Sequence, residues 1–127
     1  FGSIVNLSSD RANVADGTHL LYSTAKGGIA AMTRELAFTL GKDNIRVNAV
    51  LPGYIHTDMT DHYLHQKGMK EHILYHSALP NLLTAEDVAR VIYFLCDTEN
   101  TAISGQCIAV DAGMNVFAGG INKEETK

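Results

Sequence analysis

Three side chains suited to proton transfer, Ser9, Tyr22 and Lys26, lie near the N-terminus of this chain. Residues i and i+4 share one face of a helix, so the phenol of Tyr22 and the ammonium of Lys26 are expected to project together. A nearby ammonium stabilises the phenolate form of a tyrosine, which can then exchange a proton with a substrate hydroxyl or carbonyl near neutral pH. Ser9 follows an apolar strand, thirteen positions before the tyrosine, where its hydroxyl can hold the same substrate oxygen.

The Tyr-x-x-x-Lys spacing is also common on helix surfaces, so a solvated pair is the alternative interpretation. The surrounding sequence favours the catalytic one, because six segments resemble the short-chain dehydrogenase/reductase family over nearly the whole chain. These segments occur along the chain in the same order as in the family, which argues against a chance similarity. The six segments are Gly2-Ser3-Ile4-Val5-Asn6-Leu7-Ser8-Ser9, Tyr22-Ser23-Thr24-Ala25-Lys26, Arg46-Val47-Asn48-Ala49-Val50, Pro52-Gly53-Tyr54-Ile55-His56-Thr57, Ser104-Gly105-Gln106 and Val110-Asp111-Ala112-Gly113.

The resemblance implies a role for each of the three side chains. In the family, the Tyr22 position is the general acid/base, the Ser9 position orients and polarises the substrate oxygen, and the Lys26 position hydrogen-bonds the nicotinamide ribose. The implied activity is that of an NAD(P)-dependent oxidoreductase, which transfers hydride between nicotinamide and an alcohol or ketone carbon. Sugar or polyol alcohols and 3-oxoacyl thioesters are both open as substrates.

The cofactor, NAD or NADP, is expected to contact further positions. Ligands of open α/β sheets bind beyond the carboxyl ends of the strands, and the segment 52–57 follows a strand. The matching family positions predict that the backbone of Ile55 and the hydroxyl of Thr57 satisfy the nicotinamide carboxamide; an ordinary Pro-Gly turn is the alternative. The family's determinants of NAD or NADP preference are not in this sequence. The predicted cofactor-binding residues are Tyr22, Lys26, Pro52, Gly53, Ile55 and Thr57.

Alternating strand and helix patterns predict the fold that positions these residues. The short apolar run at 3–7 suits a strand buried on both faces. Further strands are expected at 45–51, stopped by Pro52 and Gly53, and at 106–110. Residues 20–40 and the stretch after Thr84 have helical periodicity. The predicted fold class is α/β, the C-terminal half of a Rossmann-like doubly wound parallel sheet. We expect a single domain over residues 1–127, with a partly flexible tail at 115–127.

Local signals predict the ends and faces of the helices. Gly41 is expected at the C′ position of the first helix, and Thr84 is expected to cap the last helix with an acidic residue at N3. Gly27 and Gly28 each cost about 1 kcal/mol relative to Ala inside a helix. They predict close packing against a neighbouring subunit, or else a merely tolerated pair. The apolar stripes are Ile29, Met32, Leu36 and Leu40 in the first helix and Val88, Val91, Ile92 and Leu95 in the last.

The stretch from Thr57 to Ser77 is expected to form two short helices interrupted by Gly68, and residues 58–79 match the variable substrate lid of the family. His72 and His76 are four residues apart, a spacing that metal sites use, but no third ligand is placed clearly. Lid or solvated histidines are therefore predicted, and no metal. Past the last strand, Ala112 stands where the family usually has glycine, so a positive φ there is less comfortable. The lid's predicted apolar underside is Tyr63, Leu64, Met69, Ile73 and Leu74.

The opening segment of the family is not in this sequence. No Gly-rich turn of the kind that binds a dinucleotide pyrophosphate follows an N-terminal strand. The missing N-terminal dinucleotide-binding half is therefore a predicted partner, and this chain alone is expected to be inactive. The chain is interpreted as a fragment, a proteolytic product or one piece of a split protein. The alternative function is a non-enzymatic piece that only assembles on other chains.

Composition argues against several other kinds of partner. The net charge is −4 with histidine neutral, and no basic stripe is visible, so nucleic acid is not expected. No stretch approaches the roughly 18 apolar residues of a membrane span. Cys96 and Cys107 are predicted to be buried free thiols of a cytoplasmic protein. Family subunit contacts usually involve the Tyr–Lys helix and the last helix and strand, so a homo-oligomer is expected.

Overall fold

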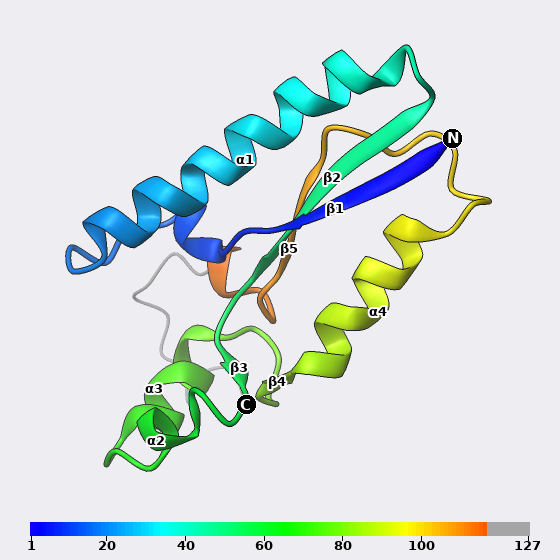
Figure 1. Cartoon of the computed structure of the whole chain (residues 1–127). Coiled ribbons are helices and arrows are strands. Elements are labelled where there is room, and N and C mark those ends of the chain that lie inside the picture. Colours follow the sequence, from blue (N-terminus) through cyan, green and yellow to red (C-terminus); the bar gives the residue numbers. More distant parts are fainter. Residues whose placement is uncertain (117–127) are drawn as a thin grey trace.

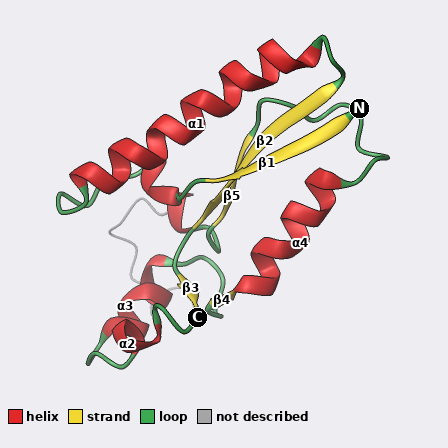
Figure 2. Ribbon diagram, in the orientation of Figure 1, coloured by secondary structure: helices red, strands yellow, loops and turns green. Residues whose placement is uncertain are grey.

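The computed structural model describes residues 1–116 and contains a three-stranded parallel sheet between two long helices (Figures 1 and 2). The strands are β1 (Gly2–Leu7), β2 (Ile45–Pro52) and β5 (Cys107–Val110), hydrogen-bonded in the order β1-β2-β5. Helix α1 (Leu20–Gly41) covers one face and α4 (Ala85–Cys96) the other. This arrangement confirms the predicted part of a Rossmann-like parallel α/β fold. The tail prediction falls mostly on residues outside the described range.

The middle strand forms the core of the molecule. Its apolar side chains Val47, Ala49, Val50 and Leu51 are fully buried, because β1 and β5 flank it and a helix covers each face. A central strand covered on both faces is rich in apolar residues rather than alternating. The strand at 3–7, predicted to be buried on both faces, is instead the edge strand β1, with Ile4 and Leu7 exposed because no further strand of the described residues flanks it. Val50 packs with Val88 and Leu95 of α4 in one apolar cluster.

Two polar side chains of β2 are also buried, and each is hydrogen-bonded to backbone. The guanidinium of Arg46 donates to the carbonyls of Leu95 at 2.9 Å, Asp97 at 3.1 Å and Ile103 at 3.2 Å. A cation at a helix C-terminus also interacts favourably with the helix dipole, so Arg46 stabilises the end of α4. Asn48 donates to the carbonyl of Ile103 and accepts from the amide of Gln106, which fixes the connection to β5.

Helix α4 begins and packs as the sequence predicts. The hydroxyl of Thr84 accepts from the amide of Asp87, and the Asp87 carboxylate accepts from the amide of Thr84, which is a capping box. Val88 and Leu95 are buried, and Val91 and Ile92 pack against them.

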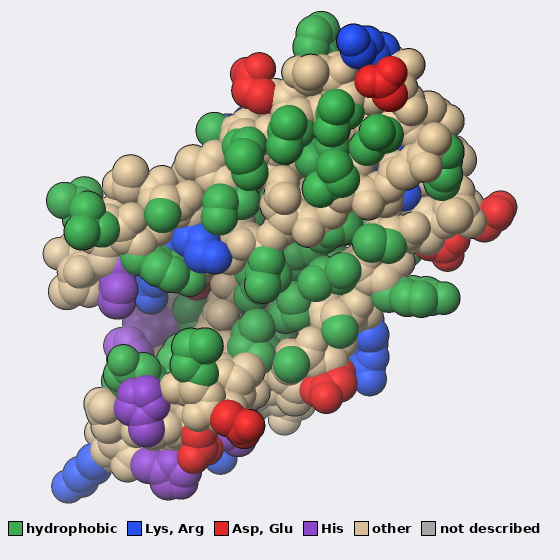
Figure 3. Space-filling view, viewed as in Figure 1, with side chains coloured by type: hydrophobic (Ala, Val, Ile, Leu, Met, Phe, Trp, Pro, Cys, Tyr) green, Lys and Arg blue, Asp and Glu red, His purple; other side chains and the backbone are tan. Residues whose placement is uncertain are grey.

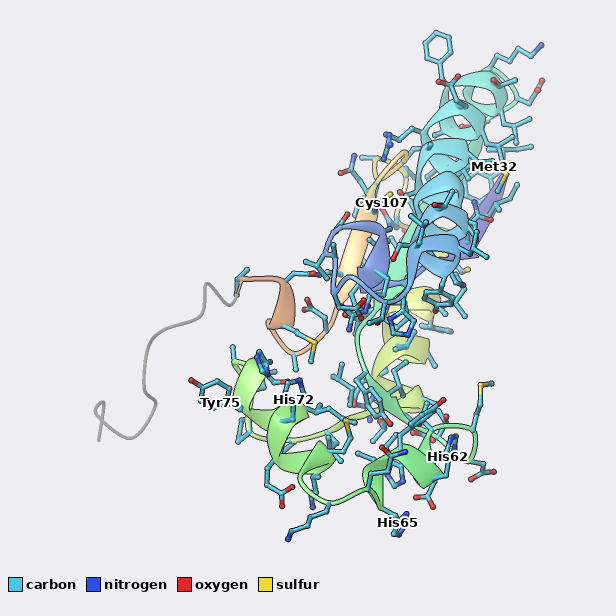
Figure 4. The ribbon with its side chains drawn as sticks, turned by 90° about the vertical axis from the view of Figure 1, so that its left-hand side faces the viewer. Met32, His62, His65, His72, Tyr75 and Cys107 are labelled. Carbon is cyan, nitrogen blue, oxygen red and sulfur yellow. The ribbon has the colours of Figure 1, made fainter. Side chains whose placement is uncertain are left out.

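The predicted apolar stripe of α1 is confirmed only in part, because Ile29, Leu36 and Leu40 are half-buried rather than buried. The buried residues of α1 are Ala30 and Thr33, whereas Met32 is exposed and projects from the flank of the helix (Figure 4). Thr33 donates to the carbonyl of Ile29 and accepts a hydrogen bond from Asn6 of β1 at 3.0 Å. Small side chains let the helix lie close to the sheet, so packing distance outweighs hydrophobicity on this face.

Three further sequence expectations about residues in or near α1 and α4 need correction or stay open. Gly41 is the last residue of α1 rather than C′, and the left-handed position falls on Asn44, with φ of 57°. A Cβ on Gly27 or Gly28 meets nothing within 4 Å in this chain, so their subunit contact stays a prediction. Both cysteines are free, but Cys96 is exposed rather than buried because it lies on the outer side of α4; Cys107 is half-buried.

A smaller unit extends from the carboxyl end of β2. Strands β3 (Ile55–His56) and β4 (Leu83–Thr84) pair in parallel, and between them lie α2 (Asp61–Leu64) and α3 (Met69–His76). Gly68 separates the two helices with φ of 80°, as predicted. The two-residue strands were not predicted, because they are too short to show a period. The unit projects beside the sheet as a lid (Figure 1).

Candidate active site

A cleft of about 950 Å³ lies between the lid and the carboxyl ends of the strands. One wall is the loop from Ser9 to His19 together with Tyr22, and the other is made by residues of the lid. Gly53, Tyr54 and Met114 complete the lining. Figure 3 shows the hollow between the two walls, with histidine side chains on both sides of it.

Ser9 lies at the first wall of this cleft and is largely buried. It is the N-cap of a short 3-10 helix, η1 (Asp10–Ala12), where its hydroxyl accepts from the amide of Arg11 at 3.2 Å. The same hydroxyl donates to the carboxylate of Asp10 at 3.0 Å. Capping therefore fixes the position of the serine oxygen at the cleft.

Tyr22 lines the same cleft as Ser9, so the fold brings these two predicted residues together. Its side chain is 47% exposed, and among the described residues its hydroxyl has no hydrogen-bond partner. The hydroxyl is thus available to a molecule in the cleft.

Lys26 lies beside the tyrosine and does not itself line the cleft. Its Nζ atom is 5.7 Å from the centre of the Tyr22 ring and donates to the carbonyl of Leu7 at 3.1 Å. The backbone carbonyl of Lys26 accepts from the hydroxyl of Ser8 at 2.7 Å. These two bonds attach α1 to the end of β1 and set the distance between the predicted catalytic side chains.

The predicted cofactor segment 52–57 is held by close contacts. Gly53 lines the cleft, and a Cβ there would lie 2.8 Å from the Cα of Asp111, so only glycine fits between the two chain segments. The Thr60 hydroxyl donates to the carbonyl of Ile55 at 2.6 Å and accepts from the amide of Thr57 at 2.9 Å. Pro52 is buried at the end of β2. Ile55 and Thr57 therefore lie at the base of the lid and not on the cleft wall.

Tyr54 and the end of β5 connect the cleft to the lid. The Tyr54 hydroxyl donates to the carbonyl of Thr60 at 3.0 Å, and burial raises the pKa of this phenol above its ordinary value. The carbonyl of Ala112 accepts from the amides of Ala78 and Leu79, which follow α3. Ala112 has φ of 55°, so the conformation that the sequence marked as uncomfortable for alanine is the one adopted.

Three of the five residues of the lid's predicted apolar underside face the cleft, and two histidines face it as well. Tyr63, Met69 and Ile73 line the cleft, whereas Leu64 and Leu74 do not. His72 and His76 also line it, with ring centres 4.3 Å apart. In Figure 4 His72 lies on the side of α3 nearer to α1, and His65 lies at the outer edge of the lid. Within residues 1–116, no group of three histidine, cysteine or carboxylate side chains is placed to hold a metal ion.

The outer side of the lid has its own charge cluster. The Asp61 carboxylate accepts from His56 at 2.9 Å and lies 3.3 Å from His65. The hydrogen bond from His56 holds the pKa of Asp61 below its ordinary value. His56 and His65 are therefore paired with a carboxylate of the lid and do not line the cleft.

The loop between Ser9 and Tyr22 contains a network that the sequence did not reveal. The Asp16 carboxylate accepts from the amide and the hydroxyl of Thr18, each at 2.9 Å, and from Nδ1 of His19 at 2.7 Å. Arg11 lies 3.5 Å from the same carboxylate. Above all the amide hydrogen bond from Thr18 holds the pKa of Asp16 far below its ordinary value. The only sequence signal was an Asp-Gly-Thr turn.

Comparison with known proteins identifies the class to which this fold and cleft belong. The sequence profile described as enoyl-(acyl carrier protein) reductase matches residues 1–115. The chain belongs to the short-chain dehydrogenase/reductase family, as the motifs predicted. A 3-oxoacyl-[acyl-carrier-protein] reductase of Chlamydia pneumoniae is 38% identical over 113 residues, which are 89% of this chain and 45% of the relative.

Solved structures of similar fold contain nicotinamide cofactors. A 4-hydroxyisoleucine dehydrogenase complexed with NADH superposes with a TM-score of 0.87 at 29% identity, over 91% of this chain and 47% of that one. A candidate 2-deoxy-D-gluconate 3-dehydrogenase from Agrobacterium tumefaciens, with NADP bound, gives a TM-score of 0.86 at 29% identity over the same shares. The chain spans about half the length of the curated relatives it matches.

Proposed function

We propose that this chain is the proton-transferring half of an NAD(P)-dependent oxidoreductase that acts on an alcohol or ketone carbon. The observation that carries the proposal is the hydroxyl of Tyr22. It lines the same cleft as Ser9, has no hydrogen-bond partner among residues 1–116, and lies next to the ammonium of Lys26. No other described phenol in the cleft combines these three properties.

Tyr22 is the general acid/base in this proposal. In reduction it donates its proton to the oxygen of the forming alcohol, and in oxidation it accepts the proton of the substrate hydroxyl. The ammonium of Lys26 stabilises the phenolate that remains after donation. Ser9 orients the substrate oxygen by a hydrogen bond, because the cap at the start of η1 holds its own oxygen at the cleft.

The residues present fit the nicotinamide end of the cofactor in the chemistry of their donor atoms. When bound, the cofactor supplies or accepts the hydride. Lys26 and Tyr22 would contact the nicotinamide ribose; Pro52, Gly53, the backbone of Ile55 and the hydroxyl of Thr57 would hold the carboxamide side. The carbonyl of Ile55 and the hydroxyl of Thr57 are each hydrogen-bonded to the Thr60 hydroxyl, so Thr60 orients the groups that would meet the carboxamide.

The cleft lining favours a substrate with an apolar body. Tyr54, Tyr63, Met69 and Ile73 supply apolar surface around the polar groups of Ser9 and Tyr22. Sugar or polyol alcohols and 3-oxoacyl thioesters both present an oxygen at the reacting carbon.

The complete protein is proposed to include an N-terminal dinucleotide-binding half. Strand β1 is an edge of the described sheet, with Ile4 38% and Leu7 54% exposed, and a further strand would cover that edge. The long helices and β5 would then be free to form a homo-oligomer. From its two free cysteines we propose a cytoplasmic location. No helix within residues 1–116 has the length and apolar character needed to cross a bilayer.

Replacing the proposed acid/base tests this function. In the complete enzyme, Tyr22→Phe should lower turnover by about 10²-fold or more, because the transferable proton is lost with the hydroxyl. The thermal midpoint should change little, since the Tyr22 hydroxyl has no partner among the described residues. Tyr93→Phe, on the exposed side of α4, is the matched control. Near-normal turnover of Tyr22→Phe with NAD(P)H and a ketone would show that the assignment is wrong.

A second candidate is a non-enzymatic piece that only assembles on other chains, and the open β1 edge favours it. Intact mass of the purified material separates the two. A single species of 13.8 kDa supports the isolated piece, whereas co-purification of an N-terminal half of similar size supports the enzyme.

A further inference from the structure

The loop before the catalytic helix fixes one imidazole at the cleft. Nδ1 of His19 is 2.7 Å from the Asp16 carboxylate, and that carboxylate is itself held by Thr18 and Arg11. His19 is the N-cap residue of α1, yet its side chain makes no capping hydrogen bond. The ordering of Asp16 therefore serves the orientation of the imidazole, which lines the cleft, rather than the start of the helix.

The hydrogen bond to Asp16 also decides which atom of the ring is left for another partner. A carboxylate accepts, so Nδ1 of His19 carries the hydrogen, and Nε2 is the second hydrogen-bonding atom of the ring. Nε2 has no hydrogen-bond partner among residues 1–116. The other polar side chains of this wall already have partners in the structure, because Asp10 accepts from the Ser9 hydroxyl and Arg11 is paired with Asp16; Val14 and Ala15 are apolar.

His19 lies one helical turn before Tyr22, with ring centres 6.3 Å apart and the planes inclined at 68°. Side chains at this spacing lie on the same face of a helix and can contact one bound molecule together. If Tyr22 and Ser9 take the oxygen of the reacting carbon, Nε2 is placed to contact a second polar atom of the same substrate, a few bonds away.

We propose that His19 is a specificity-determining residue, which hydrogen-bonds a second oxygen on the carbon next to the reacting carbon. The substrates would be α-hydroxyketones and the corresponding vicinal diols. This inference rests on the function proposed for Tyr22 and adds the substrate class. Asp16 is the positioning residue that holds the His19 ring.

Two amide substitutions distinguish the contributions of the two ring nitrogens of His19. His19→Asn places a donor near the position of Nδ1 and keeps the bond to Asp16, but it removes Nε2. His19→Gln places its amide near the position of Nε2 and gives up the bond to Asp16. His65→Asn is the control, because His65 is exposed at the outer edge of the lid and does not line the cleft.

The readout is the ratio of kcat/KM for a hydroxyketone to that for the matching ketone, in the complete enzyme with NADH and with NADPH. The pairs are 3-hydroxybutan-2-one with butan-2-one, and 2-hydroxy-1-phenylpropan-1-one with propiophenone. The wild type should favour the hydroxyketone by about tenfold or more, the effect of one hydrogen bond to a polar group. His19→Asn should bring the ratio close to one, and His19→Gln should restore part of it. Damage to the fold alone would lower both members of a pair and leave the ratio unchanged.

Three outcomes overturn the inference. The first is an unchanged ratio in His19→Asn. The second is a raised KM for the cofactor with an unchanged ratio, which would assign His19 to cofactor binding. The third is a wild-type enzyme that reduces neither hydroxyketone but reduces other ketones in a Tyr22-dependent manner, in which case the proposed function stands and this substrate class fails. Activity on the hydroxyketones that survives Tyr22→Phe would instead contradict the proposed function.

Discussion

The turn after β5 should not tolerate any side chain at Gly113. This residue has φ of 78°, and a Cβ added to it would lie 2.6 Å from the Cβ of Ala78. The two segments cannot move apart freely, because the carbonyl of Ala112 accepts from the amide of Ala78 at 2.8 Å and from that of Leu79 at 3.1 Å. Gly113→Ala would therefore force the end of the lid away from the sheet.

The expected cost has two parts. A left-handed backbone conformation costs an L-residue about 1–2 kcal/mol, and overpacking of a close contact costs about 1–3 kcal/mol. Together they predict a loss of about 2–5 kcal/mol from a total stability of about 5–15 kcal/mol. Gly68→Ala is the matched control, since Gly68 has φ of 80° and nothing lies within 4 Å of its Cβ position. It should lose the first part only.

Urea unfolding of the complete protein, followed by circular dichroism, measures both variants. Adding Ala78→Gly to Gly113→Ala should recover the steric part, so the double-mutant cycle should give an interaction energy of about 1–3 kcal/mol. Equal losses in Gly113→Ala and Gly68→Ala, or no recovery in the double variant, would refute the steric argument.

Three other outcomes are expected. The isolated chain should bind NAD(P) weakly or not at all, because the helix N-terminus that binds the pyrophosphate is not in its sequence; a micromolar dissociation constant from titration calorimetry would contradict this. In sedimentation at micromolar concentration the isolated chain should form dimers, larger oligomers or aggregates through its open β1 edge, and the N-terminal half should suppress them; a sharp monomer with a cooperative thermal transition would show an autonomous domain instead. The backbone hydrogen bond from Thr84 lowers the pKa of Asp87 below its ordinary value of about 3.9, so its stabilisation of α4 is present above that pH and is lost as the pH falls through the lowered value. Asp87→Asn should therefore lower the thermal midpoint at pH 7, and the difference from the wild type should narrow below pH 4; a difference that does not depend on pH would exclude the carboxylate as the cause.

Much of the scaffold could be predicted because local signals and tertiary packing agree in it. Strand β2 lies where the sequence predicts a strand and is buried on both faces, and the capping box of Thr84 and Asp87 starts α4 where the sequence places it. The prediction that Ser9 and Tyr22 belong to one site rested on the family resemblance, because the spacing alone left a solvated Tyr–Lys pair as an alternative.

The features that the sequence did not predict share a physical reason, which is that contacts between distant segments decide them. On α1 the close approach of the sheet selects Ala30 and Thr33 over larger apolar side chains. The left-handed conformation of Ala112 is maintained by its bonds to the chain after α3, although the residue type disfavours it. Neither preference can be read from the periodicity of one segment. The network around Asp16 was hidden for a related reason, because it depends on the path of a loop.

In this structure the hydroxyls of Ser9 and Tyr22 are not equally available to a substrate. The Ser9 hydroxyl donates to Asp10 and accepts from the amide of Arg11, so it must leave the Asp10 carboxylate before it can donate to a substrate oxygen. The Tyr22 hydroxyl has no described partner to leave. Because the same short loop contains Asp10, Arg11 and Asp16, a substrate that draws Ser9 away from Asp10 acts on the segment that also holds His19. The orientation of the reacting oxygen by Ser9 and the recognition of the second substrate oxygen by His19 would then depend on one another through this loop.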